Sequence, residues 1–258
     1  GMFMDIYNEA VALFREVMGV PENYEVLFLQ GGATLEFAAV PLNLMRASHT
    51  ADYIDSGNFA HLAAEEAKKY GTVNVVASSR AENYIRIPDL DAIRFTPDAD
   101  YVYITTNNTI YGTRYTKLPE TGAVPLVADA SSNILSEPLD VSRFGVLYAG
   151  TQKNMGPAGL AVVVVRKDLL GFAAPTCPKV IDWAVQVKNE SMINTPNTFA
   201  IYMIKLVCEW MKERGGVPAF YEYNQRKAKI LYDYLDQSRL FHNPVEKEYR
   251  SLMNVTFV

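Results

Sequence analysis

The chain has 258 residues, of which 49% are hydrophobic, and a formal net charge of -5. This length accommodates one large domain or one and a half smaller ones, with enough apolar side chains for a sizeable core. The acidic balance and the dispersed Lys and Arg residues form no basic stripe of the kind that neutralises a phosphate backbone, which argues against a nucleic-acid partner.

The first part of the chain predicts a helix, a strand and a second helix. Apolar residues recur at helical spacing over residues 3–17, which indicates an amphipathic helix. Residues 26–29 are a short apolar run typical of a buried strand, and the pair Gly31 and Gly32 predicts a sharp turn after it. Residues 34–45 follow as a helix, in which Pro41 predicts a kink or an early end.

The middle of the chain alternates between helix and strand signals. Residues 59–70 predict a helix that Gly71 stops as its C-cap. Such an alternation predicts an α/β fold with a mostly parallel sheet covered by helices on both faces. The further strands are expected at short β-rich runs flanked by Gly, Pro, Asn or Asp, namely residues 73–77, 101–105, 124–128, 146–149 and 160–165.

The last part of the chain changes to long helices. Two helices are expected over residues 199–214 and 217–235, separated by Gly215 and Gly216. Residues 254–258 predict a strand with no turn after it. We therefore predict a large domain over residues 1–216 and, over residues 217–258, the start of a small C-terminal domain that is incomplete.

Membrane insertion, secretion and metal binding are not indicated. No apolar run approaches the roughly 20 residues of a membrane span, and no secretory signal opens the chain. Two isolated cysteines, Cys177 and Cys208, fit a reducing compartment as buried thiols, so we expect a cytoplasmic protein. No metal site is predicted, because no common ligand spacing is matched by the three histidines, which are expected at the surface: His49, His61 and His242.

Two buried strands each lead to a single charged residue. One is followed directly by Asp129, and the other leads through a short turn to Lys153. Ligands bind at the carboxyl ends of strands in open α/β sheets, so both side chains would point into one crevice. A desolvated lysine can lose its proton and bind a carbonyl carbon, and an aspartate can keep a pyridine nitrogen protonated, which is the pair that pyridoxal 5'-phosphate (PLP) requires. The alternative is that Asp129 caps the turn after it and Lys153 is a surface loop residue.

The sequence Gly31-Gly32-Ala33-Thr34 lies between a predicted strand and a predicted helix. Glycines allow close approach of the backbone to a phosphate, and a helix N-terminus offers unpaired N–H groups, which suits a cofactor phosphate. A Gly-Gly turn followed by a Thr N-cap is equally typical of ordinary helix initiation.

Five ordered motifs carry a resemblance that covers nearly the whole chain. They are FLQGGAT at 28–34, FAAVPLN at 37–43, ADASS at 128–132, GTQKNMGPAG at 150–159 and NTPNTFA at 194–200. In these motifs the chain resembles the phosphoserine aminotransferases, a family of PLP-dependent enzymes. The resemblance implies the α/β fold of PLP-dependent transferases, with a mostly parallel sheet of the seven-stranded type, helices on both faces, and a small C-terminal α/β domain of which only the beginning is present.

The resemblance also implies a role for each site residue. Lys153 would bind the cofactor covalently and Asp129 would pair with its pyridine nitrogen, so these two are the expected catalytic residues. Many family members carry a tryptophan where this chain has Phe59, whose smaller ring stacks with less overlap. The other cofactor contacts would be Ala33, Thr34 and Gln152 at the phosphate, Thr109 and Phe59 at the ring, and Asn194 and Thr195 reaching the phosphate from the neighbouring subunit.

The family transfers an amino group from glutamate to 3-phosphohydroxypyruvate, giving phosphoserine and 2-oxoglutarate, and it serves a related step towards pyridoxine. The resemblance therefore implies an aminotransferase of serine biosynthesis that works as a homodimer with shared active sites. The family's substrate-binding arginines and histidine lie in segments that this chain does not contain. That difference leaves open the alternative of a truncated PLP-binding dimer core without full activity. A PLP-dependent lyase or desulfurase on the same fold fits the five motifs less well.

Overall fold

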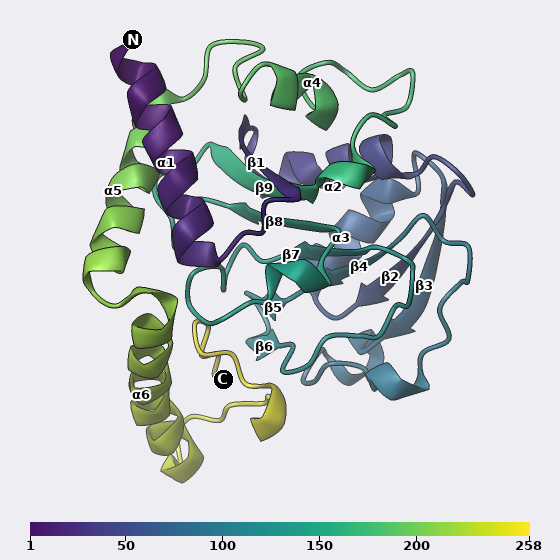
Figure 1. Ribbon diagram of the computed structural model, residues 1–258. Helices are drawn as coiled ribbons and strands as arrows, with labels where there is room; N and C mark the ends of the chain where they lie inside the picture. The colour runs from purple at the N-terminus through teal and green to yellow at the C-terminus, as the bar shows by residue number, and fades with distance from the viewer.

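A seven-stranded sheet between two layers of helices forms the body of the protein in the computed structural model, which describes all residues 1–258 (Figure 1). The strands follow the spatial order β1-β9-β8-β7-β4-β2-β3, and a separate two-stranded ribbon pairs β5 with β6. The strands are β1 Tyr24–Gln30, β2 Thr50–Asp55, β3 Thr72–Ser78, β4 Tyr101–Thr105, β5 Asn107–Asn108, β6 Thr113–Arg114, β7 Leu126–Asp129, β8 Val146–Gly150 and β9 Leu160–Arg166.

The sheet is mostly parallel, as predicted. Every neighbouring pair from β8 through β7, β4 and β2 to β3 runs parallel. Only β9 breaks this pattern, because it runs antiparallel to both β8 and β1. The carboxyl ends of the parallel strands therefore meet along one edge, where α/β sheets bind ligands.

Helices cover both faces of the sheet, which confirms the predicted layers. Helices α1 and α5 lie side by side over one face, and α2, α3 and α4 lie over the other (Figure 1). The side chains of β1 alternate accordingly, since Val26 and Phe28 join the core cluster under α1 and α5, whereas Leu27 and Leu29 join the other. The helices are α1 Met2–Met18, α2 Gly32–Leu44, α3 Asn58–Ala67, α4 Trp183–Lys188, α5 Thr198–Glu213 and α6 Gly216–Gln237.

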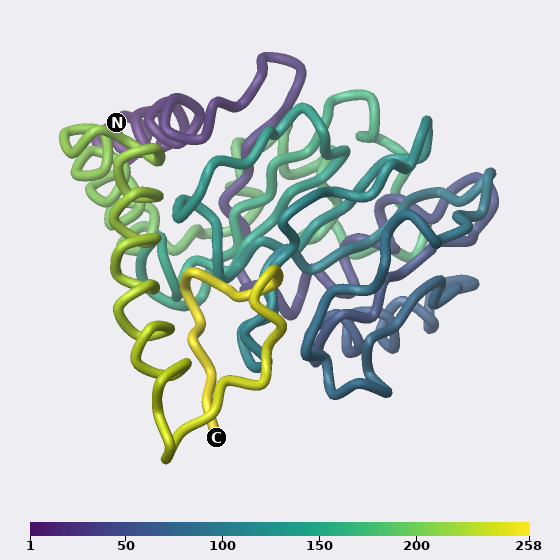
Figure 2. The backbone as a smooth tube through the Cα atoms, turned by 90° about the horizontal axis from the view of Figure 1, so that it is seen from below, coloured from purple at the N-terminus to yellow at the C-terminus, as the bar shows by residue number.

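The C-terminal part begins with α6, which packs on α5 and α1. After α6 the chain turns back towards the middle of the molecule (Figure 2). The division into a large domain over 1–216 and the start of a second domain over 217–258 stays a prediction. No helix is both long enough and apolar enough to cross a membrane.

The predicted C-terminal end of the helix over residues 59–70 is wrong. α3 ends at Ala67, and its C-cap is Lys68 rather than Gly71. Gly71 has a different role, because a Cβ atom there would lie 2.7 Å from the carbonyl oxygen of His49. The prediction for α2 also needs correction, since this helix begins at Gly32 and continues through Pro41 to Leu44.

Two strand predictions are also corrected. Residues 254–258 form no strand, although His242 and Val258 exchange two backbone hydrogen bonds of 2.9 Å. β2 was not predicted, because acidic residues such as Asp52 are atypical of a buried strand. The carboxylate of Asp52 is buried there and accepts a hydrogen bond from the backbone N–H of Thr96 at 2.6 Å. Burial of a charged group is tolerated when such bonds replace its water.

Smaller differences concern α4, which was not predicted, and β7, which begins two residues later than expected. Cys208 is buried as predicted, whereas Cys177 is only half-buried. His49 and His242 are exposed as predicted, and His61 is half-buried.

Candidate active site

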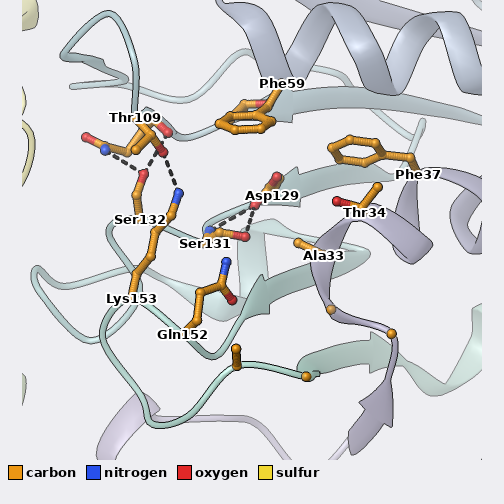
Figure 3. A pocket seen from close by; sticks show the side chains of 16 residues that line it. Ala33, Thr34, Phe37, Phe59, Thr109, Asp129, Ser131, Ser132, Gln152 and Lys153 are labelled. Atoms are coloured by element: carbon orange, nitrogen blue, oxygen red, sulfur yellow. Dashed lines mark hydrogen bonds between the residues drawn. The ribbon is translucent and has the colours of Figure 1, made fainter.

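A cavity of about 330 Å³ opens at the carboxyl ends of the parallel strands (Figure 3). It is lined by residues of the β1–α2 turn, the start of α3, the ends of β4 and β7, and the loop after β8. Seven of the nine residues predicted from the sequence line this single cavity: Ala33, Thr34, Phe59, Thr109, Asp129, Gln152 and Lys153.

Asp129 is the last residue of β7 and is 4% exposed. Its Oδ1 atom accepts two hydrogen bonds from Ser131, one from the backbone N–H at 2.8 Å and one from the hydroxyl at 2.6 Å. Its Oδ2 atom accepts no hydrogen bond from the chain and is not shut off from the cavity. Burial raises the pKa of Asp129, while the Ser131 bonds and the charge of Lys153 act in the opposite direction. Asp129 therefore caps the following turn and also faces the cavity, so for this residue the two sequence-based alternatives are compatible.

Lys153 follows β8 in the loop that closes one side of the cavity. Its Nζ atom donates a 2.7 Å hydrogen bond to the hydroxyl of Thr109 and lies 5.4 Å from the centre of the Phe59 ring. Removal of water by the surrounding protein lowers the pKa of Lys153, and the nearby charge of Asp129 partly offsets this effect. A larger fraction of this amine is therefore neutral at a given pH than for a fully hydrated lysine.

The start of α2 forms another wall. Gly31 and Gly32 both have positive φ values, 107° and 67°, and no side chain caps the helix. The first-turn N–H groups, including those of Ala33 and Thr34, consequently have no partner within the helix. The Thr34 side chain is exposed and its hydroxyl makes no hydrogen bond in the chain. Free amides and the positive end of the helix dipole make this wall suitable for an anion such as a phosphate.

Between these walls lies space suited to a flat ring. Figure 3 shows the Phe59 ring over the opening and Gln152 on the opposite side, with Lys153 to one flank and Ala33 and Thr34 to the other. An aromatic ring over the opening of the cavity can stack on a planar cofactor. The cavity thus brings together an amine, a carboxylate, an anion-binding helix end and a stacking surface.

Asn194 and Thr195 are the two predicted residues that do not line the cavity. Both are exposed in the loop before α5. The side-chain amide of Gln30, at the end of β1, donates to Asn194 Oδ1 at 3.3 Å and to the Thr195 carbonyl oxygen at 2.7 Å. The predicted role of this pair requires a second subunit, so their position outside this cavity is compatible with it.

Sequence reasoning missed the polar residues that support the site. Ser131 holds Asp129, and its hydroxyl also accepts a 2.9 Å hydrogen bond from the N–H of Gly150 on β8. Asn107 lines the cavity and is 2% exposed. The only available signal was the clustering of short polar residues directly after the strands, which is equally typical of ordinary turns.

The fold and this site define a PLP-type aminotransferase, and the comparisons agree. The profile of the class-V aminotransferases matches residues 1–258, and the chain belongs to this family. Its sequence is 52% identical to a phosphoserine aminotransferase of Bacillus cereus over 255 residues, which cover 99% of this chain and 71% of that relative. A phosphoserine aminotransferase of Pseudomonas syringae is 49% identical over the same shares.

Solved structures show the same likeness. The phosphoserine aminotransferase of Bacillus circulans subsp. alkalophilus superimposes with a TM-score of 0.96 at 42% identity, covering 100% of this chain and 72% of that one. PLP-bound phosphoserine aminotransferase from Trichomonas vaginalis gives a TM-score of 0.96 at 38% identity, with the same coverage. An alanine–glyoxylate aminotransferase of Nostoc sp. shares the fold, with a TM-score of 0.75 at 16% identity.

Proposed function

We propose that the protein is a PLP-dependent aminotransferase that moves the amino group of glutamate to 3-phosphohydroxypyruvate, giving O-phospho-L-serine and 2-oxoglutarate. The family match and the 52% identity to a phosphoserine aminotransferase support this reaction. The observation that carries it is one cavity in which Lys153, Asp129 and the uncapped start of α2 converge. The same chemistry on 3-hydroxy-2-oxo-4-phosphonooxybutanoate would serve pyridoxine biosynthesis.

The residues of the cavity fit PLP. The backbone of Ala33 and the amide and hydroxyl of Thr34 would hold the phosphate, assisted by Gln152. Phe59 would stack on the ring, and Asp129 Oδ2 would accept a hydrogen bond from the protonated ring nitrogen. When bound, PLP supplies a carbonyl carbon that joins covalently to amines and a ring that accepts electrons from the substrate's α-carbon.

Lys153 has the properties of a nucleophile and a proton carrier. Desolvation lowers its pKa, so its amine is more readily neutral and able to attack a carbonyl carbon. The same neutral amine can accept a proton from the substrate's α-carbon and return it to another carbon. The hydroxyl of Thr109 holds Nζ at the edge of the cavity by its 2.7 Å hydrogen bond. Asp129 contributes a negative charge, because the two hydrogen bonds from Ser131 favour the carboxylate form.

The first experiment is an absorbance spectrum of the purified protein supplied with PLP, before and after addition of glutamate. We expect the long-wavelength band of lysine-bound PLP, its loss in Lys153→Ala, and a change in the band when glutamate is added. A band that ignores glutamate would support the alternative, which the comparisons do not favour, of a PLP-binding core without full activity. Absence of the band in the unaltered protein would refute the cofactor assignment.

We further propose a homodimer in which Asn194 and Thr195 complete the phosphate site of the partner subunit. Their exposure and their fixed position beside Gln30 support this role. Subunits carrying Lys153→Ala and subunits carrying Asn194→Ala should each be impaired alone, whereas a mixed dimer contains one intact site. Recovery of activity on mixing the two variants supports shared sites, and no recovery contradicts them.

A cytoplasmic location completes the proposal. The two cysteines form no disulfide, which supports a reducing compartment. Fractionation of the source cells tests this, and a protein found only outside the cytoplasm would refute it.

A further inference from the structure

The segment after α6 contacts the turn between β5 and β6, next to the active site. Ser251 donates its backbone N–H to the carbonyl oxygen of Gly112 at 2.8 Å, and the Thr256 hydroxyl donates to the carbonyl oxygen of Tyr111 at 3.2 Å. Both acceptors lie in the turn between β5 and β6, which also contains Thr109. Residues from the far end of the chain thus support the turn that supplies a hydroxyl to the cavity.

The side chain of Asn107 joins this segment to the cavity. Its Nδ2 atom donates to Ser132 Oγ at 2.7 Å and to Asn254 Oδ1 at 2.8 Å. Its Oδ1 atom accepts from the Ser251 hydroxyl at 2.6 Å. Both N–H groups and the carbonyl of this buried amide are therefore used, which leaves the Asn107 side chain a single favourable orientation.

Ser251 is equally constrained. It is 0% exposed, and its hydroxyl donates to Asn107 while accepting from the backbone N–H groups of Met253 at 3.1 Å and Asn254 at 3.0 Å. A hydroxyl has one donor and two acceptor positions, and all three are occupied. The same atom thus shapes the C-terminal turn and holds Asn107.

The two segments also approach each other too closely for a side chain at Gly112. This residue has φ +77°, and a Cβ atom there would lie 2.8 Å from the carbonyl oxygen of Asn254. Close backbone packing and a saturated hydrogen-bond network resist displacement. A shift of either segment would therefore be transmitted to the other.

We propose that Ser251 is a positioning residue for the active site, acting through Asn107 on Thr109 and thereby on the amine of Lys153. Thr109 stands two residues after Asn107, and its hydroxyl accepts the hydrogen bond from Lys153 Nζ at 2.7 Å. The link to catalysis rests on the proposed function, because Lys153 matters as the cofactor lysine. The positional link itself depends only on contacts within the chain.

The test compares Ser251→Ala with Ser238→Ala in the full chain. Ser238 is a matched control, since its hydroxyl accepts backbone N–H bonds from Leu240 at 3.1 Å and Phe241 at 3.0 Å in a similar turn. Unlike Ser251, it makes no hydrogen bond to a residue that lines the cavity. The readout is the pH dependence of acetylation of Lys153, followed by mass spectrometry in protein freed of cofactor. The cofactor dissociation constant of the same variants is measured in parallel.

We expect Ser251→Ala to move the Lys153 acetylation profile to lower pH by about 0.5 to 1 unit, because a hydroxyl acceptor favours the charged amine. Cofactor binding should weaken by about tenfold, the scale of one net hydrogen bond. Ser238→Ala should change neither quantity. Because Ser251→Ala can impair folding, Asn254→Ala, which removes a different partner of Asn107, provides a second variant with the same expected direction.

A double-mutant cycle separates this role from a merely structural one. In a Thr109→Val background, Ser251→Ala should cause no further shift of the Lys153 profile, because the hydroxyl through which it acts is gone. Two outcomes overturn the proposal. One is an equal shift of the Lys153 profile with Thr109 and with Thr109→Val, and the other is no shift when Ser251→Ala is made in the chain that keeps Thr109. If PLP failed to bind the unaltered protein, the proposed function would fall while the acetylation cycle would still test this inference.

Discussion

Glu36 offers the sharpest stability test in this protein. It lies on α2, is 0% exposed, and neither of its carboxyl oxygens has a hydrogen-bond partner. Burial raises its pKa from 4.5 to about 8. The nearby indole N–H of Trp183 acts in the opposite direction and favours the charged form of Glu36. The indole N–H and the carboxyl group nevertheless form no hydrogen bond. The folded protein therefore holds a neutral carboxylic acid where the unfolded chain holds a carboxylate at neutral pH.

The sign of the effect follows from this difference. Because the folded pKa of Glu36 is raised, its contribution to stability is complete below about 4.5 and is lost as pH rises towards about 8. Each pKa unit corresponds to about 1.4 kcal/mol, so the loss approaches about 5 kcal/mol above pH 8 and about 3 kcal/mol at pH 7. Glu36→Gln keeps the shape and removes the titration. The variant should match the original protein near pH 5 and be several kcal/mol more stable near pH 8.

Urea unfolding from pH 5 to pH 9, at fixed protein and cofactor concentrations, measures this difference. Glu22→Gln is the control, because Glu22 is exposed and makes no hydrogen bond or ion pair. Its stability should differ from that of the original protein by a small amount that does not grow with pH. If the curves for Glu36→Gln and the original protein run parallel across the range, Glu36 does not titrate in this way and the reasoning fails.

Three further predictions concern the cavity. Ser131→Ala removes the 2.6 Å hydroxyl bond to Asp129, so the pKa of Asp129 should rise further. Cofactor affinity should fall by about tenfold in an absorbance titration. Unchanged affinity would contradict the role of this bond. Gly31→Ala places a Cβ atom 2.4 Å from Leu35 Cδ2, in a residue whose φ is +107°. This change should destabilise the protein by about 1 to 3 kcal/mol in a urea titration. Unchanged stability would show that the turn relaxes freely. Phe59→Leu keeps an apolar side chain but removes the aromatic stacking face. The cofactor dissociation constant should therefore rise by about 3 to 10 times in a dilution assay. An unchanged dissociation constant would exclude stacking.

Much of the fold could be predicted from local sequence. The apolar runs at residues 101–105 and 160–165 became buried strands, and the helical spacing over residues 3–17 became α1. Burial and periodicity act within a few residues, so they can be recognised without knowing the partners. The rule that ligands bind at the carboxyl ends of parallel strands was enough to place Asp129 and Lys153 in one cavity.

Features that depend on distant partners could not be predicted in this way. β2 contains Asp52, which is tolerated in a buried strand because Asn74 and Thr96, both distant in sequence, donate hydrogen bonds to it. The antiparallel placement of β9 between β8 and β1 is likewise a property of the assembled sheet. Local propensity carries no information about which strand will become a neighbour.

The sequence alone determined which residue types the site contains, because a lysine, an aspartate and a glycine-rich helix start each follow a strand. Only the tertiary structure decided how they are held. The hydroxyl of Thr109 meets Lys153, and Ser251 meets Asn107 across most of the chain length. A hydrogen bond is short and directional, so it forms only after packing has brought its two partners together, and no local pattern records that meeting in advance.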